Sequence, residues 1–176
     1  MQGNSVRDIS HFFVAGINYK KTDAALRGQF AVNNEQYTAI LALAPSFGLS
    51  ELFILSTCNR TEIYGFSDDA RRLVSLLCTQ TTGGADMFTE MAYSKNGAEA
   101  IEHLFNVAAG IDSQILGDYE IVGQLKLAVK FAKERGFIGT MLDRLTNAVF
   151  QSSKAIRPAS HIFWKTPAAT HSWKRS

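Results

Sequence analysis

Residues 51–67 read ELFILSTCNRTEIYGFS, two runs rich in β-branched and aromatic residues around a short polar turn. The first run, ELFILST, predicts a short central strand, and TEIYGFS predicts its hairpin partner. Cys58 then lies at the bend between them. The other elements are placed around this hairpin.

Segments on both sides of the hairpin extend it into a sheet. HFFVAGINY, residues 11–19, predicts a buried strand, and Asn33-Asn34-Glu35 precedes a predicted helix that Pro45 breaks. After the hairpin, residues 71–79 place leucines at helical spacing, and residues 87–93 alternate well enough to predict a fourth strand. The order βαββαβ favours a ferredoxin-like α+β sandwich over residues 11–97.

From Gly97 onward the hydrophobic period is that of helices. Three apolar stripes predict a helical subdomain of three helices over residues 98–157, packed on the sandwich. The first stripe consists of Ile101, Leu104, Phe105 and Ala108. Pro158 lacks the backbone N–H that a helix needs, so we expect the last helix to end at or before Arg157.

The composition changes after that point. Residues 158–176 hold both tryptophans and two of the three prolines, and five basic residues but no acid follow position 153. We therefore expect one domain over residues 1–157, followed by an atypical, non-native tail over residues 158–176.

The overall composition excludes several classes of protein. The 176 residues are 46% hydrophobic with a net charge of +2, and no apolar run approaches the roughly 18 residues of a membrane span, so we expect a cytoplasmic protein without membrane contact. Two cysteines and four dispersed histidines predict neither a disulfide framework nor a metal site. No glycine-rich fingerprint follows a strand, so the usual dinucleotide and phosphate cradles are absent.

Cys58 is the candidate nucleophile. It lies in the run Ser-Thr-Cys-Asn-Arg-Thr-Glu, and a nearby cation or backbone donor lowers the pKa of a thiol from about 8.5. Arg60 suits that role, or that of gripping a substrate carboxylate through two parallel hydrogen bonds. The alternative is a buried, inert cysteine beside a polar turn. Cys78, which ends the apolar run LVSLLC, is assigned to the core.

Two further features are candidates for a site. His103 lies off the apolar stripe of its helix, so we expect it outside the core, either as a solvated surface histidine or as a site histidine facing the cysteine turn. The segment GIDSQILGDYE, residues 110–120, suits a binding loop or a simple helix connection with Asp118 as its cap.

Three strings resemble glutamyl-tRNA reductases, which catalyse the first step of the C5 route to tetrapyrroles. They are GINYKKTD at residues 16–23, STCNRTEIY at residues 56–64 and HLFNVAAGIDSQILGDYEIVGQLKLA at residues 103–128. The second and third are long, specific and in the family's order and spacing. The resemblance extends over residues 11–157.

The resemblance implies a thiol mechanism. Cys58 matches the nucleophile that attacks the ester carbonyl of glutamyl-tRNA and holds glutamate as a thioester, which NADPH then reduces to glutamate-1-semialdehyde. His103 matches a histidine important for activity. Substrate contacts are implied for a set of polar and aromatic residues: Thr57, Asn59, Arg60, Ser113, Asp118, Tyr119, Glu120 and Gln124.

The chain departs from the family in two ways. Asp118-Tyr119-Glu120 stands where the family commonly has Glu-Pro-Gln, which leaves the role of Glu120 open, with the substrate's α-ammonium group as one target. The family also continues into an NADPH-binding and a dimerisation domain, for which 176 residues leave no room. We therefore expect no cofactor in this chain, only the acyl-transfer half-reaction, and a dimer only for the full-length enzyme.

The expected partners are glutamyl-tRNA and the aminotransferase that acts on glutamate-1-semialdehyde. One alternative is a non-catalytic module that recognises the tRNA or the aminotransferase without turnover. Another is a thiol enzyme that acts on a different small acyl substrate.

Overall fold

A four-stranded antiparallel sheet forms the centre of the computed structural model, which describes residues 8–115 and 119–164. Its strands are β1 (Phe12–Asn18), β2 (Leu52–Ser56), β3 (Arg60–Phe66) and β4 (Tyr93–Asn96). They stand in the order β2-β3-β1-β4, and each neighbouring pair is antiparallel. This is the strand order of a ferredoxin-like βαββαβ sandwich, so the predicted fold class is confirmed.

The β2–β3 hairpin is as tight as the sequence predicts. Ser56 pairs with Thr61, and the backbone N–H of Thr57 donates to the carbonyl oxygen of Arg60 at 2.8 Å. Cys58 and Asn59 therefore form the tip of the turn. All seven residues of β3 are buried because helices cover both faces of the sheet, so the charged residues of this strand lie in the interior.

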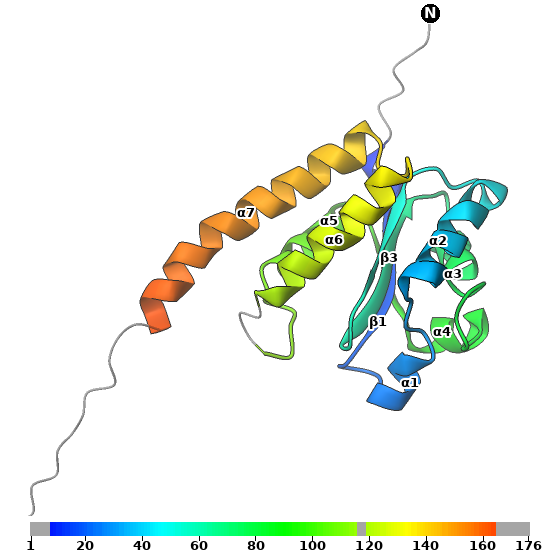
Figure 1. Ribbon diagram of the computed structural model, residues 1–176, viewed down its shortest axis with the longest axis horizontal. Coiled ribbons are helices and arrows are strands. Elements are labelled where there is room, and N and C mark those ends of the chain that lie inside the picture. The colour runs from blue at the N-terminus through cyan, green and yellow to red at the C-terminus, as the bar shows by residue number, and fades with distance from the viewer. Residues whose placement is uncertain (1–7, 116–118, 165–176) are drawn as a thin grey trace, which may run out of the picture.

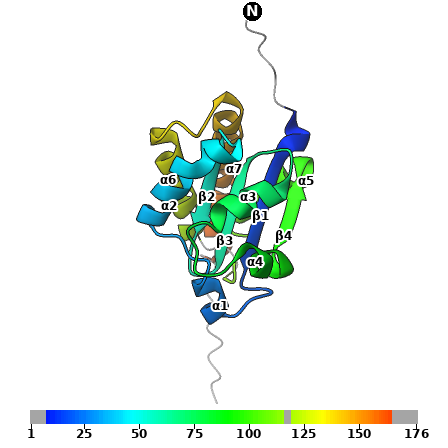
Figure 2. The ribbon, with the colours of Figure 1, turned by 90° about the vertical axis from the view of Figure 1, so that its right-hand side faces the viewer.

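The helices form a layer on each side of the sheet (Figures 1 and 2). On one side lie α2 (Asn34–Leu43), α3 (Ala70–Leu77) and α4 (Ala85–Met91), and on the other lie α5 (Gly97–Ala108) and α6 (Glu120–Glu134). The short α1 (Ala24–Gly28) lies near the turn of the hairpin. Two 3-10 turns complete the fold: η1 (Ile9–His11) directly precedes β1, and η2 (Ala44–Phe47) directly follows α2.

The helix predicted after Asn33 is confirmed as α2. The side chain of Asn33 accepts from the N–H of Gln36, and the Gln36 side chain accepts from the N–H of Asn33. This capping box satisfies two N–H groups that a helix start otherwise leaves unpaired. The helix ends at η2, which contains Pro45, as predicted.

The strand predicted at residues 87–93 is wrong. Residues 85–91 form α4, and the fourth strand begins only at Tyr93. Phe88 is the buried residue of α4, and its ring meets Phe30 edge-on at 5.2 Å. A helix that buries one side chain does not require apolar and polar residues to alternate. The alternation of residues 87–93 therefore did not mark a half-buried strand.

The expected helix end before Pro158 is also wrong. The helix α7 (Thr140–Trp164) packs on the outer side of α5 and α6 and continues through Pro158. A proline inside a helix removes one backbone hydrogen bond, and here that loss does not end the helix. Residues 165–176 of the predicted tail lie outside the described residues.

Cys78 is only partly in the core. It follows the last residue of α3, is half-buried, and packs against the core from its margin. Burial raises the pKa of its thiol, while a hydrogen bond with Thr81 opposes that change. These surroundings favour the neutral, unreactive form.

Candidate active site

Cys58 lies exposed at the tip of the β2–β3 turn. Its carbonyl oxygen accepts a hydrogen bond from Nε of Arg27 at 3.1 Å, and the N–H of Asn59 donates to Oγ1 of Thr57 at 3.2 Å. The carbonyl of Asn59 accepts from the N–H of Tyr19. The turn is therefore held through its backbone, and the expectation of the alternative that Cys58 is buried is wrong.

A small groove of about 50 Å³ opens beside this thiol. The hairpin turn forms one wall, and the start of α6 together with the loop before it forms the other. Its lining is mainly polar and consists of Thr57, Cys58, Asn59, Arg60, Ser113, Glu120, Ile121 and Gln124.

Arg60 forms the inner wall of the groove and is 1% exposed. Its Nη1 donates to Oε1 of Glu62 and to Oδ2 of Asp112, both at 3.2 Å, and its Nη2 donates to the backbone carbonyl of Asp112. Its buried Nε has no hydrogen-bond partner among the described residues. Arg60 is thus anchored on one side and retains a free donor on another.

Glu62 is the hub behind the groove and is completely buried. Its Oε1 accepts from Arg60, from the hydroxyl of Tyr93 and from Nε2 of His103 at 2.6 Å, while its Oε2 accepts from the hydroxyl of Tyr64 at 2.6 Å. Burial raises the pKa of Glu62, but the hydrogen bond from His103 and the charge of Arg60 outweigh it and lower that pKa to about 2. Glu62 is therefore a carboxylate at neutral pH.

Gly16 on β1 makes room for this hub. A Cβ atom at Gly16 would lie 2.6 Å from Cγ of Glu62 and 3.1 Å from the backbone oxygen of Thr61. Real Cβ atoms do not approach so closely, so a larger residue would displace either the carboxylate or the strand pairing. The buried carboxylate of Glu62 therefore requires a glycine at position 16.

His103 is buried, with 8% exposure, which contradicts the expectation that it lies outside the core. The inward face of α5 carries Ala100, Leu104 and Val107 beside it, so the buried stripe is rotated from the predicted one. The helix packs between β1 and α7 and therefore has contacts on two sides. His103 does not line the Cys58 groove and reaches it only through Glu62 and Arg60.

Asp112 ties the loop after α5 to the hairpin. Its carboxylate accepts from Arg60 and from Nζ of Lys20, which follows β1. Burial raises the pKa of Asp112, but the hydrogen bond from Lys20 and the charge of Arg60 lower it below its usual range. Two cations and two carboxylates thus alternate from Lys20 through Asp112 and Arg60 to Glu62.

The matches with known proteins cover most of the chain. A family model described as "Glutamyl-tRNAGlu reductase, N-terminal domain" matches residues 15–160. The chain belongs to this family. The glutamyl-tRNA reductase of Christiangramia forsetii is 44% identical over 152 residues, and that of Flavobacterium psychrophilum is 41% identical over 162 residues.

These matches concern one part of the glutamyl-tRNA reductases. They cover 86% and 92% of this chain but only 36% and 39% of the two relatives, so the chain spans about a third of their length. The solved glutamyl-tRNA reductase from Methanopyrus kandleri superposes with a TM-score of 0.71 at 28% identity, covering 85% of this chain and 35% of that one.

The three strings that resemble glutamyl-tRNA reductases converge in space. The first supplies Gly16 and Lys20, the second supplies Cys58 with Arg60 and Glu62, and the third supplies His103 and Asp112. Of the substrate contacts that the resemblance implied, six line the groove with Cys58: Thr57, Asn59, Arg60, Ser113, Glu120 and Gln124. Tyr119 is 38% exposed and is not part of this lining, and Asp118 lies outside the described residues.

The carboxylates and phenols of the cluster were not predicted from the sequence. Glu62 carried a usable signal, because it is a charged residue inside a run that otherwise reads as a buried strand. Tyr64 follows two residues later on the same strand face. Asp112 lies in the predicted binding loop of residues 110–120, but no local pattern distinguishes it from its neighbours. Neither Tyr93 nor Lys20 lies in a local pattern that indicates a site.

The described residues show no site for a metal, and none of their helices combines the length and apolar character needed to cross a bilayer. The residues of this chain also do not fit the nicotinamide nucleotide that a reductase requires, because the glycine-rich loop that binds its phosphates is missing from the sequence.

Proposed function

We propose that this chain carries the acyl-transfer centre of a glutamyl-tRNA reductase, with Cys58 as the nucleophile. The observation that supports this most directly is the exposed Cys58 thiol on the rim of a groove whose inner wall is the buried cation Arg60. An accessible thiol beside a fixed positive charge suits attack on an ester that carries an anionic side chain.

The proposed step exchanges an oxygen ester for a thioester. The Cys58 sulfur attacks the carbonyl carbon of the glutamyl ester, a C–S bond forms, and the C–O bond to the ribose breaks. The thiol proton passes, directly or through solvent, to the departing ribose oxygen. The thioester retains an electrophilic carbonyl, so the product can react again.

Arg60 is proposed to bind the γ-carboxylate of the glutamyl group. A guanidinium carries five N–H donors, and three of those in Arg60 are engaged by Glu62 and Asp112. The Nε–H has no partner among the described residues, although a buried donor normally requires one. A carboxylate that bonds Nε–H and the remaining Nη2–H would meet that requirement with two parallel hydrogen bonds.

The opposite wall is proposed to recognise the other end of the amino acid. Glu120 lines the groove at the start of α6 and offers negative charge to the substrate's α-ammonium group. Ser113 and Gln124 offer hydroxyl and amide groups on the same side of the groove. Opposite charges on the two walls would orient a glutamyl group, which carries a γ-carboxylate and an α-ammonium group, in one direction.

His103 is proposed as a positioning residue rather than as the group that transfers a proton to the substrate. It bonds Glu62, which in turn holds Arg60, and it does not line the Cys58 groove. Loss of His103 is therefore expected to weaken the binding of the glutamyl group more than it slows the attack of the thiol. Thr57 and Asn59 shape the turn that presents Cys58.

A trapping experiment tests the proposal. Incubation with glutamyl-tRNA is expected to add one glutamyl group to the chain, detected by intact mass, and the adduct is expected on Cys58. The variant Cys58→Ser should form no thioester, whereas the matched control Cys78→Ser should form it as the unchanged chain does, because Cys78 is half-buried on another face.

Salt-dependent binding of the tRNA without any adduct would contradict the proposal and favour a non-catalytic binding module. An adduct of equal yield with esters of other amino acids would contradict the assigned role of Arg60 and favour a thiol enzyme for a different acyl substrate.

Hydride transfer from NADPH, dimerisation, contact with glutamate-1-semialdehyde aminotransferase and a cytoplasmic location are proposed for the full-length enzyme. This chain matches only about a third of such an enzyme. For the residues of this chain we propose only the steps up to the thioester.

A further inference from the structure

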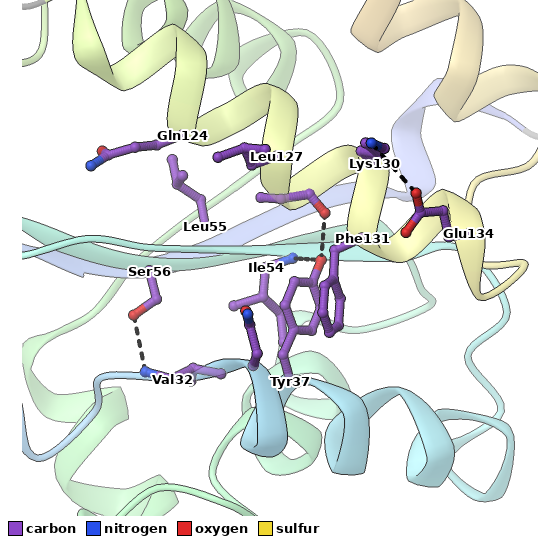
Figure 3. Close-up of a pocket in the computed structure, with 12 residues that line it drawn as sticks. Val32, Tyr37, Ile54, Leu55, Ser56, Gln124, Leu127, Lys130, Phe131 and Glu134 are labelled. Carbon is purple, nitrogen blue, oxygen red and sulfur yellow. Dashed lines mark hydrogen bonds and ion pairs between the residues drawn. The ribbon is translucent and has the colours of Figure 1, made fainter.

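A second and larger groove, of about 390 Å³, adjoins the Cys58 groove (Figure 3). It lies between α2 and α6, and the edge strand β2 runs along its floor. Gln124 lines both grooves, and Ser56 on this floor directly precedes Thr57 of the turn. The volume falls within the range of about 300–1,000 Å³ that small-molecule sites occupy.

The floor of the groove presents backbone groups of an edge strand. The hydrogen bond from Thr57 N–H to Arg60 marks these two residues as a bonded pair, so in the antiparallel ladder Ile54 and Ser56 turn their backbone groups outward. The N–H of Ile54 indeed bonds the Tyr37 hydroxyl at 2.8 Å, outside the sheet. The carbonyl of Ile54 and the N–H of Ser56 therefore face the groove side by side.

The sides of the groove form a slot with mainly apolar walls. Leu127 projects from α6 on one side, and Val32 lies on the opposite side, where its N–H bonds Oγ of Ser56 (Figure 3). Tyr37 and Phe131 stack at 4.5 Å and close one end. Lys130 stands at the rim, in a long ion pair with Glu134 at 3.7 Å.

This arrangement matches one class of ligand. A carbonyl and an N–H two residues apart offer an acceptor and a donor side by side, and adenine presents the complement, an amino group next to a ring nitrogen. Uracil presents an N3–H donor beside its O4 acceptor, so the pair suits a nucleobase in general. A flat base would contact apolar side chains on both faces, and the lysine at the rim suits a phosphate.

We propose that this second groove binds the adenosine whose ribose carries the ester that Cys58 attacks. The inference rests on the proposed acyl transfer, because every aminoacyl-tRNA carries its amino acid on a terminal adenosine. Cys58 follows Ser56 by two residue steps, which span at most about 7 Å, a distance of the size of one ribose between a bound base and the sulfur.

The first test measures binding without the thiol chemistry. In Cys58→Ser, adenosine 5′-monophosphate is expected to shift the backbone amide resonance of Ser56 and to bind at least about tenfold more tightly than ribose 5-phosphate, which lacks the base. Filling the slot with Leu127→Trp should abolish these shifts. Leu127 is 68% exposed, so the fold tolerates the change, and Met87→Trp on the exposed face of α4 is the matched control. Equal binding of adenosine 5′-monophosphate and ribose 5-phosphate, or shifts at a different place, would overturn the inference.

The second test measures acyl transfer. Glutamyl-adenosine is expected to acylate Cys58 at least about tenfold faster than glutamyl ethyl ester, and Leu127→Trp should remove this advantage without slowing the ethyl ester. Equal rates for the two esters would overturn the adenosine subsite and leave the proposed function intact. Acylation by neither ester would instead count against the proposed function.

A competition experiment distinguishes the adenosine of the ester substrate from that of a free nucleotide. Adenosine 5′-monophosphate should inhibit acylation by glutamyl-adenosine and leave acylation by the ethyl ester unchanged. Binding of the monophosphate or of NADPH, which contains the same adenosine group, without any inhibition of the adenosine ester would overturn the substrate subsite and assign the groove to a free nucleotide.

Discussion

The tip of the hairpin and the cluster behind it are built in opposite ways. Cys58 is exposed and held through backbone hydrogen bonds, whereas Glu62, only four residues later, is fully buried and receives hydrogen bonds from four side chains. The proposed nucleophile must be reachable, whereas the charges proposed to orient a substrate are effective where water is excluded. Changes at the tip should therefore affect chemistry, and changes in the cluster should affect stability.

The largest expected effect on stability is that of Glu62→Gln. The change leaves the buried Arg60 without one of its two carboxylates, and breaking a buried charge pair typically costs about 3–5 kcal/mol. Urea denaturation should show this loss, whereas Cys58→Ser and the exposed control Glu90→Gln should stay within about 0.5 kcal/mol of the unchanged chain. A loss in Glu62→Gln as small as in these controls would remove the contrast between tip and cluster.

Acid should weaken the cluster in a defined window. The pKa of Glu62 is lowered from 4.5 to about 2, so its contribution to stability is complete above pH 4.5 and is lost as the pH falls toward 2. Asp112, whose pKa is also lowered, acts in the same direction. The free energy of unfolding measured from about pH 6 to about pH 3 should therefore decrease, and it should decrease less steeply in Glu62→Gln. Equal slopes in the two proteins would contradict the assigned pKa of Glu62.

A smaller loss is expected from Gly16→Ala. The new methyl group would collide with Glu62 and with the backbone of β3, and overpacking of this kind costs about 1–3 kcal/mol. The matched control is Gly123→Ala in α6, where an added Cβ meets nothing within 4 Å, so this change should stabilise the helix by up to about 1 kcal/mol. Thermal unfolding would compare the two, and a stable Gly16→Ala would mean that the carboxylate does not need the space.

The smallest expected effect on stability is at the tip itself. Arg27→Met removes the hydrogen bonds to the carbonyl oxygens of Cys58 and Thr22 and keeps the length of the side chain. We expect a loss of about 1 kcal/mol or less together with a changed rate of alkylation of Cys58 by iodoacetamide. An unchanged alkylation rate would show that Arg27 does not control the position of the turn.

Much of the fold could be predicted from local pattern. The strands β1, β2 and β3, the capped start of α2 and the three helices after Gly97 follow from apolar spacing and turn residues. Two predictions from local pattern failed. The strand predicted at residues 87–93 is the helix α4, which buries Phe88, and the helix end predicted before Pro158 is absent because α7 continues through that residue.

The candidate site was predicted only in part. The sequence and the family resemblance pointed to Cys58 and to six residues that share its groove, because those residues occur in two recognisable strings. They did not indicate that Arg60 is buried, that Glu62 accepts four hydrogen bonds, or that Tyr93 and Lys20 contribute. Tyr93 lies 31 residues from Glu62 and Lys20 lies 92 residues from Asp112, the residues to which they donate hydrogen bonds.

The amino-acid sequence by itself determined the strands β1, β2 and β3, the helices after Gly97 and the place of Cys58 at a hairpin bend, because periodicity and turn chemistry are properties of neighbouring residues. Only the tertiary structure decided which face of α5 turns inward, and with it the burial of His103. Only the packing of α6 beside β2 formed the two adjoining grooves. The physical reason is that burial and electrostatic environment depend on groups that meet across the fold.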